Sequence, residues 1–238
     1  LQCMKKMILS AVMLVFAASG RAQEAGAASP TEHNEWLTTF EAVAVDADLD
    51  IKFVKVPDTE APKIVYDTKG SYTSKFRAEV KDKTLRISER PDSRRPDRTE
   101  VTVYYNALRA VSLSGAAATF VGTLDAAVLD VTVNRKASLT AKLDVKDLKM
   151  EQTGYSTANL SGSVRYLTLY VSTGKVAASD LEVMSAEVNA QSKADVSLWI
   201  TDRFIGKTTT NARITYKGQP AVVRGGAKFM GGEISHVE

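Results

Sequence analysis

Six polar residues in the middle of the chain, each directly after a short apolar run, recur at a nearly constant interval. They are Ser114, Asn134, Thr153, Ser172, Gln191 and Thr210. The interval between neighbours is about 19–20 residues throughout, and a fixed period of this length is typical of solenoids, in which one supersecondary unit stacks on the next. The sequence therefore predicts stacked units between residues 108 and 220.

Apolar and polar residues alternate on both sides of each of these turn positions. Such alternation predicts half-buried strands, because successive side chains of a strand point to opposite faces. The inward positions expected before the turns include Leu129, Val131, Val133, Leu167, Leu169, Val171, Met184, Ala186 and Val188. Those expected after the turns include Leu139, Ala141, Leu143, Ser179, Leu181, Val183, Val196, Leu198 and Ile200. We therefore predict an all-β parallel β-helix, or solenoid, with two short strands in each coil of about 19–20 residues.

Equivalent residues of stacked coils would form ladders about 4.8 Å apart. One outward ladder would contain Asp130, Lys149, Thr168 and Glu187. Cross-strand pairs of this kind contribute about 0.2–1 kcal/mol each. Structural stacking alone therefore explains these residues, without any chemical role for them.

The N-terminus has the order of a secretory signal peptide. Lys5 and Lys6 precede an apolar run from Met7 to Ala18, and small residues follow up to Ala22. We expect residues 1–22 to be a signal peptide that is cleaved after Ala22, and residues 23–39 to be a flexible leader. The apolar run is short for a membrane span, so we expect no transmembrane span in the mature chain.

Charge and cysteine content narrow the function classes. The chain has 31 Lys and Arg against 28 Asp and Glu, but Lys5, Lys6 and Arg21 lie in the expected signal peptide, which leaves 28 against 28. A neutral mature chain gives no electrostatic reason to expect a nucleic-acid partner. The single cysteine, Cys3, also lies in the expected signal peptide, so we expect neither disulfides nor thiol catalysis.

The remainder of the mature chain completes one predicted domain over residues 40–238. Residues 40–107 form a β-rich N-terminal portion, with a hairpin at Lys81-Asp82-Lys83 and a polar, arginine-containing loop over residues 90–98. Solenoids need their last coil covered. We expect residues 221–238 to form this C-terminal cap, with Phe229 and Met230 supplying its apolar contact.

Several landmarks of the sequence occur in a common register. They are a Phe-led strand at Phe40-Glu41-Ala42-Val43, the segment from Leu108 to Ala117 with its Leu-Ser-Gly-Ala-Ala end, the recurring turns, and Tyr216-Lys217-Gly218-Gln219-Pro220. Together they resemble the bacterial family called putative auto-transporter adhesin, head GIN domain. The turns at Asn134-Arg135-Lys136-Ala137 and Gln191-Ser192-Lys193-Ala194 depart from the pattern, because they lack glycine. The resemblance covers about residues 40 to 225. It implies an exported β-helical protein of Bacteroidetes-type bacteria with a role in adhesion and no family catalytic residues.

The sequence contains few residues of the types that enzymes use for catalysis. The two histidines, His33 and His236, are near the chain ends, so we expect no Ser-His-Asp triad, no histidine metal site and no cofactor. An alternative is a polysaccharide lyase or hydrolase that uses Asp130 with Lys149, or Asp180 with Asp195, from adjacent coils. The segment from Asp46 to Asp50 resembles the start of a calcium loop but lacks its glycine and its later Glu.

Exposed aromatic side chains suggest a binding surface. Tyr170 and Trp199 are expected to project outward from strands, and Tyr155 falls at a turn. Aromatic side chains on a rigid sheet can stack on sugars or anchor a partner. Alternatively, Trp199 packs under the cap and the protein is a purely structural envelope element. We therefore predict a non-catalytic protein that binds glycan or protein, located in the periplasm or at the surface or outer membrane of a Gram-negative bacterium.

Overall fold

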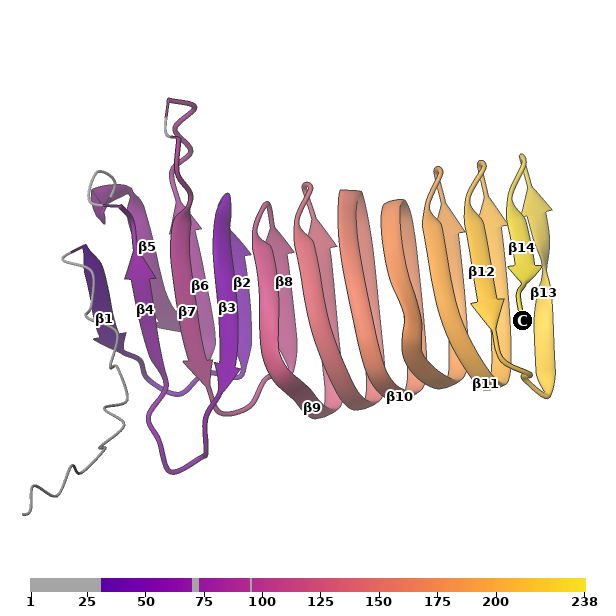
Figure 1. The fold of residues 1–238 in the computed structure, drawn as a ribbon, viewed down its shortest axis with the longest axis horizontal. Coiled ribbons are helices and arrows are strands. Elements are labelled where there is room, and N and C mark those ends of the chain that lie inside the picture. Colours follow the sequence, from indigo (N-terminus) through magenta and orange to yellow (C-terminus); the bar gives the residue numbers. More distant parts are fainter. Residues whose placement is uncertain (1–30, 70–72, 95) are drawn as a thin grey trace, which may run out of the picture.

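A computed structural model of the protein describes residues 31–69, 73–94 and 96–238, with side chains except at 73 and 226–229. The expected signal peptide lies outside the described residues. Apart from one turn of 3-10 helix, η1 (Thr73–Lys75), every element of the described part is a strand, and the strands form an elongated stack (Figure 1). The strands are β1 (Glu32–Trp36), β2 (Ala42–Asp46), β3 (Leu49–Lys55), β4 (Lys63–Asp67), β5 (Phe76–Lys81), β6 (Thr84–Glu89), β7 (Thr99–Tyr105), β8 (Ala110–Ser114), β9 (Ala117–Asn134), β10 (Ser138–Gln191), β11 (Asp195–Thr209), β12 (Arg213–Lys217), β13 (Val222–Phe229) and β14 (Glu233–His236).

The stack has two faces. We call face A the strands β5, β6, β2 and β8, continued by the later parts of β9 and β11 and by β13. Face B consists of β1, β4, β7 and β3, continued by the first residues of β9 and β11 and by β12 and β14. The long strands β9, β10 and β11 bend from one face to the other, and β10 makes several passes (Figure 1). Buried apolar side chains of both faces form one continuous core between them.

Successive passes pair in parallel, at offsets close to the period read from the sequence. Leu148 pairs with Leu129, which occupies the equivalent position one unit earlier. Val196 pairs with Val176 of the unit before it and with Ile214 of the unit after it. Lys149 pairs with Asp130, as expected for the outward ladder. The apolar side chain of each unit therefore lies beside its equivalent in the next, which explains the repeat of apolar positions.

The N-terminal portion has an order that the sequence did not reveal. Strand β2 pairs in parallel with both β6 and β8, and β3 pairs in parallel with both β7 and β9. The β2–β3 unit therefore lies between two units that follow it in sequence. Strand β4 pairs antiparallel with β7, and β5 pairs antiparallel with β6 through the predicted turn at residues 81–83.

Both ends of the stack differ from expectation. Residues 32–36 of the predicted flexible leader form β1, which pairs antiparallel with β4 along its whole length. At the other end, β13 and β14 extend both faces by pairing in parallel with β11 and β12. Met230, which was expected to cover the core, is 64% exposed. The side chain of Phe229 lies outside the described part.

Two inward predictions are wrong because the pairing slips by bulges. Met184 is 38% exposed, and Ser179 is also exposed, although the alternation placed both inside. The parallel register shifts between Ala178 and Glu182 and again between Val183 and Ser185. Each extra residue reverses which side of the strand faces the core. The alternation of inward and outward side chains is therefore interrupted at these two register shifts.

The turns that lack glycine adopt the same left-handed backbone as those that contain it. Arg135 and Lys136 have φ of 51° and 64°, and Ser192 and Lys193 have φ of 56° and 66°. In both turns the amide of the following alanine donates to the carbonyl three residues earlier, at 2.9 Å and 3.1 Å. Gly154 and Tyr155 likewise have φ of 68° and 59°, so a turn of this chain adopts two left-handed residues with or without glycine.

Candidate functional site

The three aromatic residues predicted to bind differ in their surroundings. Tyr155 lies in a turn with φ of 59° and is 75% exposed. Tyr170 is half-buried on face A, and its hydroxyl accepts a hydrogen bond from the Gln191 amide. Trp199 is half-buried on face B, with the Lys217 Nζ 5.0 Å from the ring centroid. A purely structural role would favour full burial, and none of the three side chains is fully buried.

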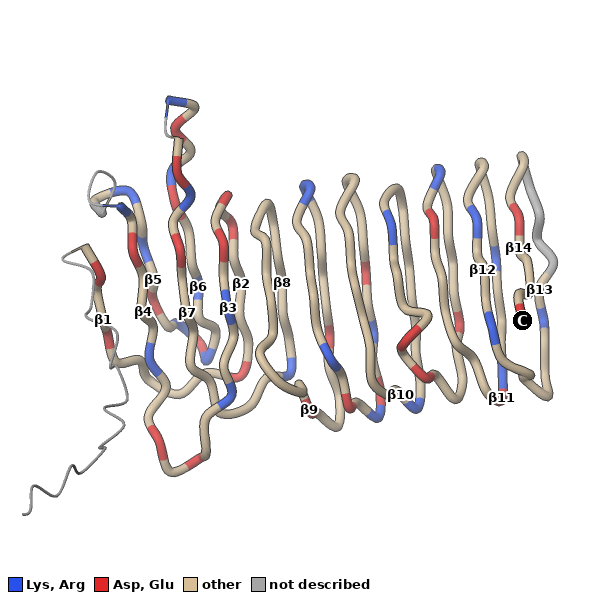
Figure 2. Tube along the Cα trace, viewed as in Figure 1, with Lys and Arg blue, Asp and Glu red and all other residues tan. Residues whose placement is uncertain are grey.

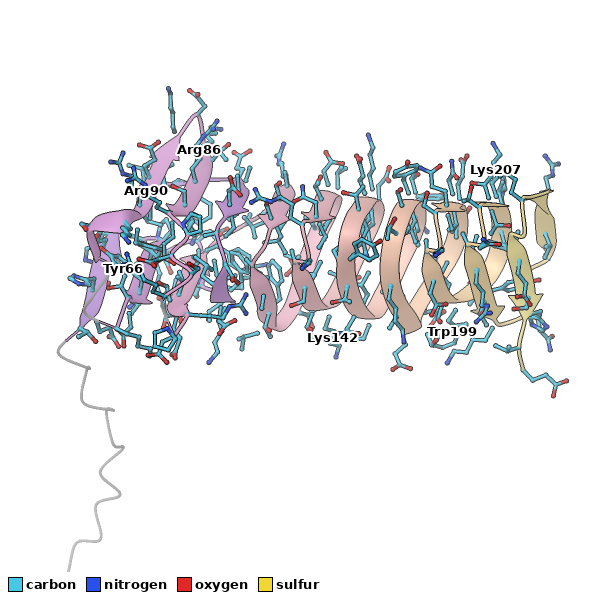
Figure 3. The ribbon with its side chains drawn as sticks, turned by 90° about the horizontal axis from the view of Figure 1, so that it is seen from above. Tyr66, Arg86, Arg90, Lys142, Trp199 and Lys207 are labelled. Carbon is cyan, nitrogen blue, oxygen red and sulfur yellow. The ribbon has the colours of Figure 1, made fainter. Side chains whose placement is uncertain are left out.

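Tyr170 and Trp199 cannot act in one site because they belong to opposite faces. The strand that follows Tyr170 by one unit, residues 187–190, pairs with residues 205–208 of face A. Figure 3 shows Lys207 from that strand on one side of the stack and Trp199 on the other. Trp199 shares its side with Lys142 (Figure 3). The predicted residues therefore define at most separate surfaces.

The acidic pairs of the enzyme alternative are only partly brought together. Asp130 and Lys149 are neighbours across two strands of face A. Asp195, however, pairs with Lys175, five residues before Asp180. Five residues correspond to about 16 Å of strand, so Asp180 and Asp195 do not form the carboxylate pair that glycoside hydrolysis needs.

The carboxylates of the acidic segment from Asp46 to Asp50 contact arginine side chains. The Asp46 carboxylate accepts from Ser114 at 3.1 Å and from Arg135 at 2.8 Å. Arg98, from the loop after β6, donates to Asp50 at 2.8 Å and also to Asp48. Asp46 ends a strand of face A whereas Asp50 is in a strand of face B. In the described part of the chain, no group of three or more His, Cys, Asp or Glu side chains could hold a metal ion.

The structure reveals a row of aromatic and apolar side chains, with one lysine among them, on the outside of face B. We call it the aromatic row, and its members pair in register across five strands: Trp36, Lys63, Tyr104, Val54 and Val121. Trp36 is 70% exposed and Val121 is 52% exposed. The Lys63 Nζ lies 5.6 Å from the Trp36 ring centroid and 4.6 Å from that of Tyr104. Cation–π contacts of this geometry hold both rings in place beside the lysine.

A second outward row of face B carries carboxylates. We call it the carboxylate row, and it consists of Glu32, Asp67, Glu100 and Asp50 on the same strands β1, β4, β7 and β3. Lys69 bridges two of these residues, with its Nζ 3.3 Å from Asp67 and 2.9 Å from Glu100.

Local hydrogen bonds and ion pairs keep the carboxylate row charged and compensated. The Thr31 hydroxyl, supported by Lys69 and opposed by burial, lowers the pKa of Asp67. The hydrogen bond to Glu100 raises the pKa of Lys69 against the effect of burial. Burial opposes the charge of Arg98, but Asp48 and Asp50 outweigh it, so its pKa is raised. Asp67, Glu100 and Asp50 of this row therefore each have a cationic partner, and Figure 2 shows Lys and Arg interspersed with Asp and Glu along much of the stack.

A shallow groove of about 430 Å³ lies beside the aromatic row. Its outward side chains belong to two neighbouring rows. Glu100, Asp50 and Ala117 lie in line with the carboxylate row, and Thr102, Lys52 and Thr119 lie between that row and the aromatic row. The small side chains of Ala117 and Thr119 leave the surface low where β9 joins the face. Four residues of strand, about 13 Å, separate Asp50 from Val54 of the aromatic row.

Sequence reasoning missed Trp36, Lys63 and Tyr104 as members of one surface. Trp36 lay in the segment read as a flexible leader, and its strand pairs with β4, which comes much later in the chain. Antiparallel pairing across such a separation leaves no periodic signal in the sequence. The sequence of β1, Glu-His-Asn-Glu-Trp, has no apolar–polar alternation, so it carries no strand signal of its own.

Comparison with solved structures shows the same fold in bacterial proteins of similar length. The protein is similar to a putative adhesin from Bacteroides fragilis (TM-score 0.77, 18% identity, 87% of this chain and 96% of that one). It is also similar to a putative adhesin from Parabacteroides merdae (TM-score 0.62, 19% identity, 87% and 95%). A putative lipid binding protein from Parabacteroides distasonis matches with TM-score 0.62, 15% identity and coverage of 87% and 96%.

The remaining observations concern membrane-spanning helices, curated relatives and the protein family. No helix in the described part of the chain is long and apolar enough to cross a membrane. No curated protein matches the sequence. The model of the family called putative auto-transporter adhesin, head GIN domain, matches residues 39–220. This match spans most of the chain and confirms the predicted resemblance: the protein belongs to the putative auto-transporter adhesin, head GIN domain family.

Proposed function

We propose that the protein is a non-catalytic, exported adhesin-like protein that binds a glycan or protein partner through face B. The observation that carries the proposal is the aromatic row, in which Trp36 and Tyr104 are held by one lysine on a flat sheet. Large exposed apolar residues that gather on a rigid surface mark interaction sites. The adhesin names of the family and of two structural neighbours agree with this role.

The architecture that suits this role is a β-solenoid with coils of about 19–20 residues. Parallel pairings between equivalent residues of successive units, such as Leu129 with Leu148, support it. Contacts between units support it too, since the Ser163 hydroxyl lies 3.2 Å from the carboxylate of Asp144 in the preceding unit. A solenoid holds its side chains in fixed ladders, so a partner meets a surface that is already arranged.

Export is the localisation that fits adhesion. The basic, apolar and small-residue segments of residues 1–22 support a signal peptide. The mature protein would then act in the periplasm or at the cell surface or outer membrane of a Gram-negative bacterium. Mass spectrometry of the exported protein should show Gln23 as its first residue, and retention of residues 1–22 would contradict this part of the proposal.

Attachment of protein-coated beads tests the binding function. Beads that carry the purified chain should adhere to bacterial or host cell surfaces more strongly than uncoated beads. The double substitution W36A/Y104A should reduce adhesion to background, because it removes both rings of the aromatic row. The matched control Y170A removes an aromatic ring from face A and should leave adhesion unchanged.

The enzyme alternative predicts a different result. If a uronate polymer were cleaved and D130A or D180A abolished the cleavage, the protein would be a polysaccharide lyase or hydrolase. Adhesion equal to that of uncoated beads would overturn the proposed function, and such turnover would favour the enzyme alternative in its place.

A further inference from the structure

We propose that the groove between the carboxylate row and the aromatic row is a subsite for a neutral saccharide chain. This inference rests on the proposed binding function and names the chemistry of the ligand. Open grooves of this size, a few hundred cubic ångströms, are large enough for small-molecule and oligosaccharide units. The groove measures about 430 Å³ and runs across strands β7, β3 and β9.

The two sides of the groove offer what the two surfaces of a sugar ring need. The aromatic row supplies the flat rings of Tyr104 and Trp36, on which the C–H face of a pyranose can stack. The floor carries the Thr102 and Thr119 hydroxyls, which both donate and accept hydrogen bonds. The carboxylates of Asp50 and Glu100 accept hydrogen bonds from hydroxyl groups. A sugar ring is apolar on one face and polar at its edge, so it matches this arrangement.

The internal ion pairs favour a neutral ligand over a charged one. Glu100 already binds Lys69 at 2.9 Å, and Asp50 already binds Arg98 at 2.8 Å. Lys63 is directed to the rings of Trp36 and Tyr104. An anionic polymer would meet the carboxylate row, and a cationic one would meet Lys52, Lys69 and Arg98. A ligand that only exchanges hydrogen bonds has no such opposition.

The length of the aromatic row favours a chain over a single sugar. Trp36 lies four strands from Val121 along the aromatic row. Four strand spacings correspond to about 19 Å. Several linked sugar units can therefore lie across the strands, with one side against the aromatic row.

The two tryptophans of the chain make the test selective. Trp36 and Trp199 are the only tryptophans, so the variant W199F leaves Trp36, at the β1 end of the aromatic row, as the sole reporter. We would titrate this variant with cellohexaose, laminarihexaose and mannohexaose as neutral probes, and with hexagalacturonate as an acidic probe. The variant W36F, which keeps only Trp199, serves as the matched reporter outside the groove.

At least one neutral probe should change the fluorescence of W199F in a saturable manner, with no comparable change in W36F. Adding T119K, which places a long charged side chain in the groove, should weaken binding by about tenfold or more. Adding Y104A should weaken it as well. Adding N159K, an equal substitution at an exposed site two strands farther along face B, should leave the affinity unchanged. Unfolding midpoints of the variants show that each is folded.

Three results would overturn the inference. A saturable response only to hexagalacturonate would show the wrong ligand class. An unchanged affinity in T119K and Y104A would show that the groove is not the site. If no saccharide probe binds but protein-coated beads still adhere to cells, the groove is not a saccharide subsite and the proposed function survives without it. If adhesion fails as well, both proposals fail.

Discussion

Gly162 provides the sharpest test of how closely the passes of the stack approach one another. Its φ is +102°, and a Cβ at this position would overlap the Leu143 carbonyl oxygen and lie 2.9 Å from the Leu143 amide nitrogen. Leu143 belongs to the preceding unit of the repeat. Because the obstructing atoms are backbone, no side-chain rotation can relieve the contact in G162A.

The matched control is Gly122, which has a similar backbone but open space. Its φ is +81°, and a Cβ would meet nothing within 4 Å. An alanine with a left-handed backbone costs about 1–2 kcal/mol, and this cost applies to both positions. Forced displacement of packed atoms costs about 1–3 kcal/mol more, and this cost applies to Gly162 alone. We therefore expect losses of about 1–2 kcal/mol for G122A and about 2–5 kcal/mol for G162A.

Urea unfolding followed by circular dichroism and by tryptophan fluorescence would measure both losses. The two signals should be compared first, because repeat proteins can unfold in parts. If G122A and G162A lose stability equally, within about 0.5 kcal/mol, then residues 143 and 162 are not in close backbone contact. The register of neighbouring passes would then be wrong.

Three further perturbations follow from single residues. The substitution Y155N should stabilise the protein by about 0.5–1 kcal/mol, because asparagine tolerates the left-handed backbone at a site where the ring is 75% exposed; a loss in the unfolding midpoint would contradict this. Burial, and then the hydrogen bond to Glu35, raise the pKa of Tyr66 to about 12 from 10.0. The neutral Tyr66 hydroxyl therefore stabilises the folded protein fully below about pH 10, and this contribution is lost as the pH rises to about 12. The variant Y66F should therefore show a smaller loss of unfolding free energy between these pH values. An unchanged slope would refute the assignment. Gln152 is fully buried, and its Nε2 donates to the Ser156 and Lys175 carbonyls at 2.8 Å and 3.0 Å. The substitution Q152A should lower the free energy of unfolding, measured in urea, by at least about 1–3 kcal/mol. An unchanged free energy of unfolding would show that water replaces the amide.

The periodic part of the structure was predictable because one geometric rule repeats there. The pairing of the strands around Leu129 and Leu148 follows from the regular spacing of the turns, and β5 and β6 meet at the turn predicted at residues 81–83. Met184 was misplaced because a bulge shifts the register, and a bulge has no signature in a pattern of apolar residues. The position of β2 and β3 between later units was likewise hidden, since alternation does not specify the partner of a strand.

The candidate site was less predictable than the fold. Tyr155, Tyr170 and Trp199 were correctly expected to lie outside the core, but the pattern could not show that Tyr170 and Trp199 occupy opposite faces. The aromatic row joins Trp36 to Tyr104 through β4, and it forms only when segments far apart in the sequence pair. A binding surface of this kind depends on tertiary pairing, whereas the core depends mainly on local alternation.

The central claim is that the protein binds its partner through face B. Hydroxyl-radical footprinting of the intact chain, free and bound to the cell surface to which coated beads adhere, tests it directly. We predict that oxidation of Trp36 and Tyr104 falls on binding while oxidation of Tyr170, on face A, stays the same. Protection of Tyr170 with unchanged oxidation of Trp36 and Tyr104 would contradict the account.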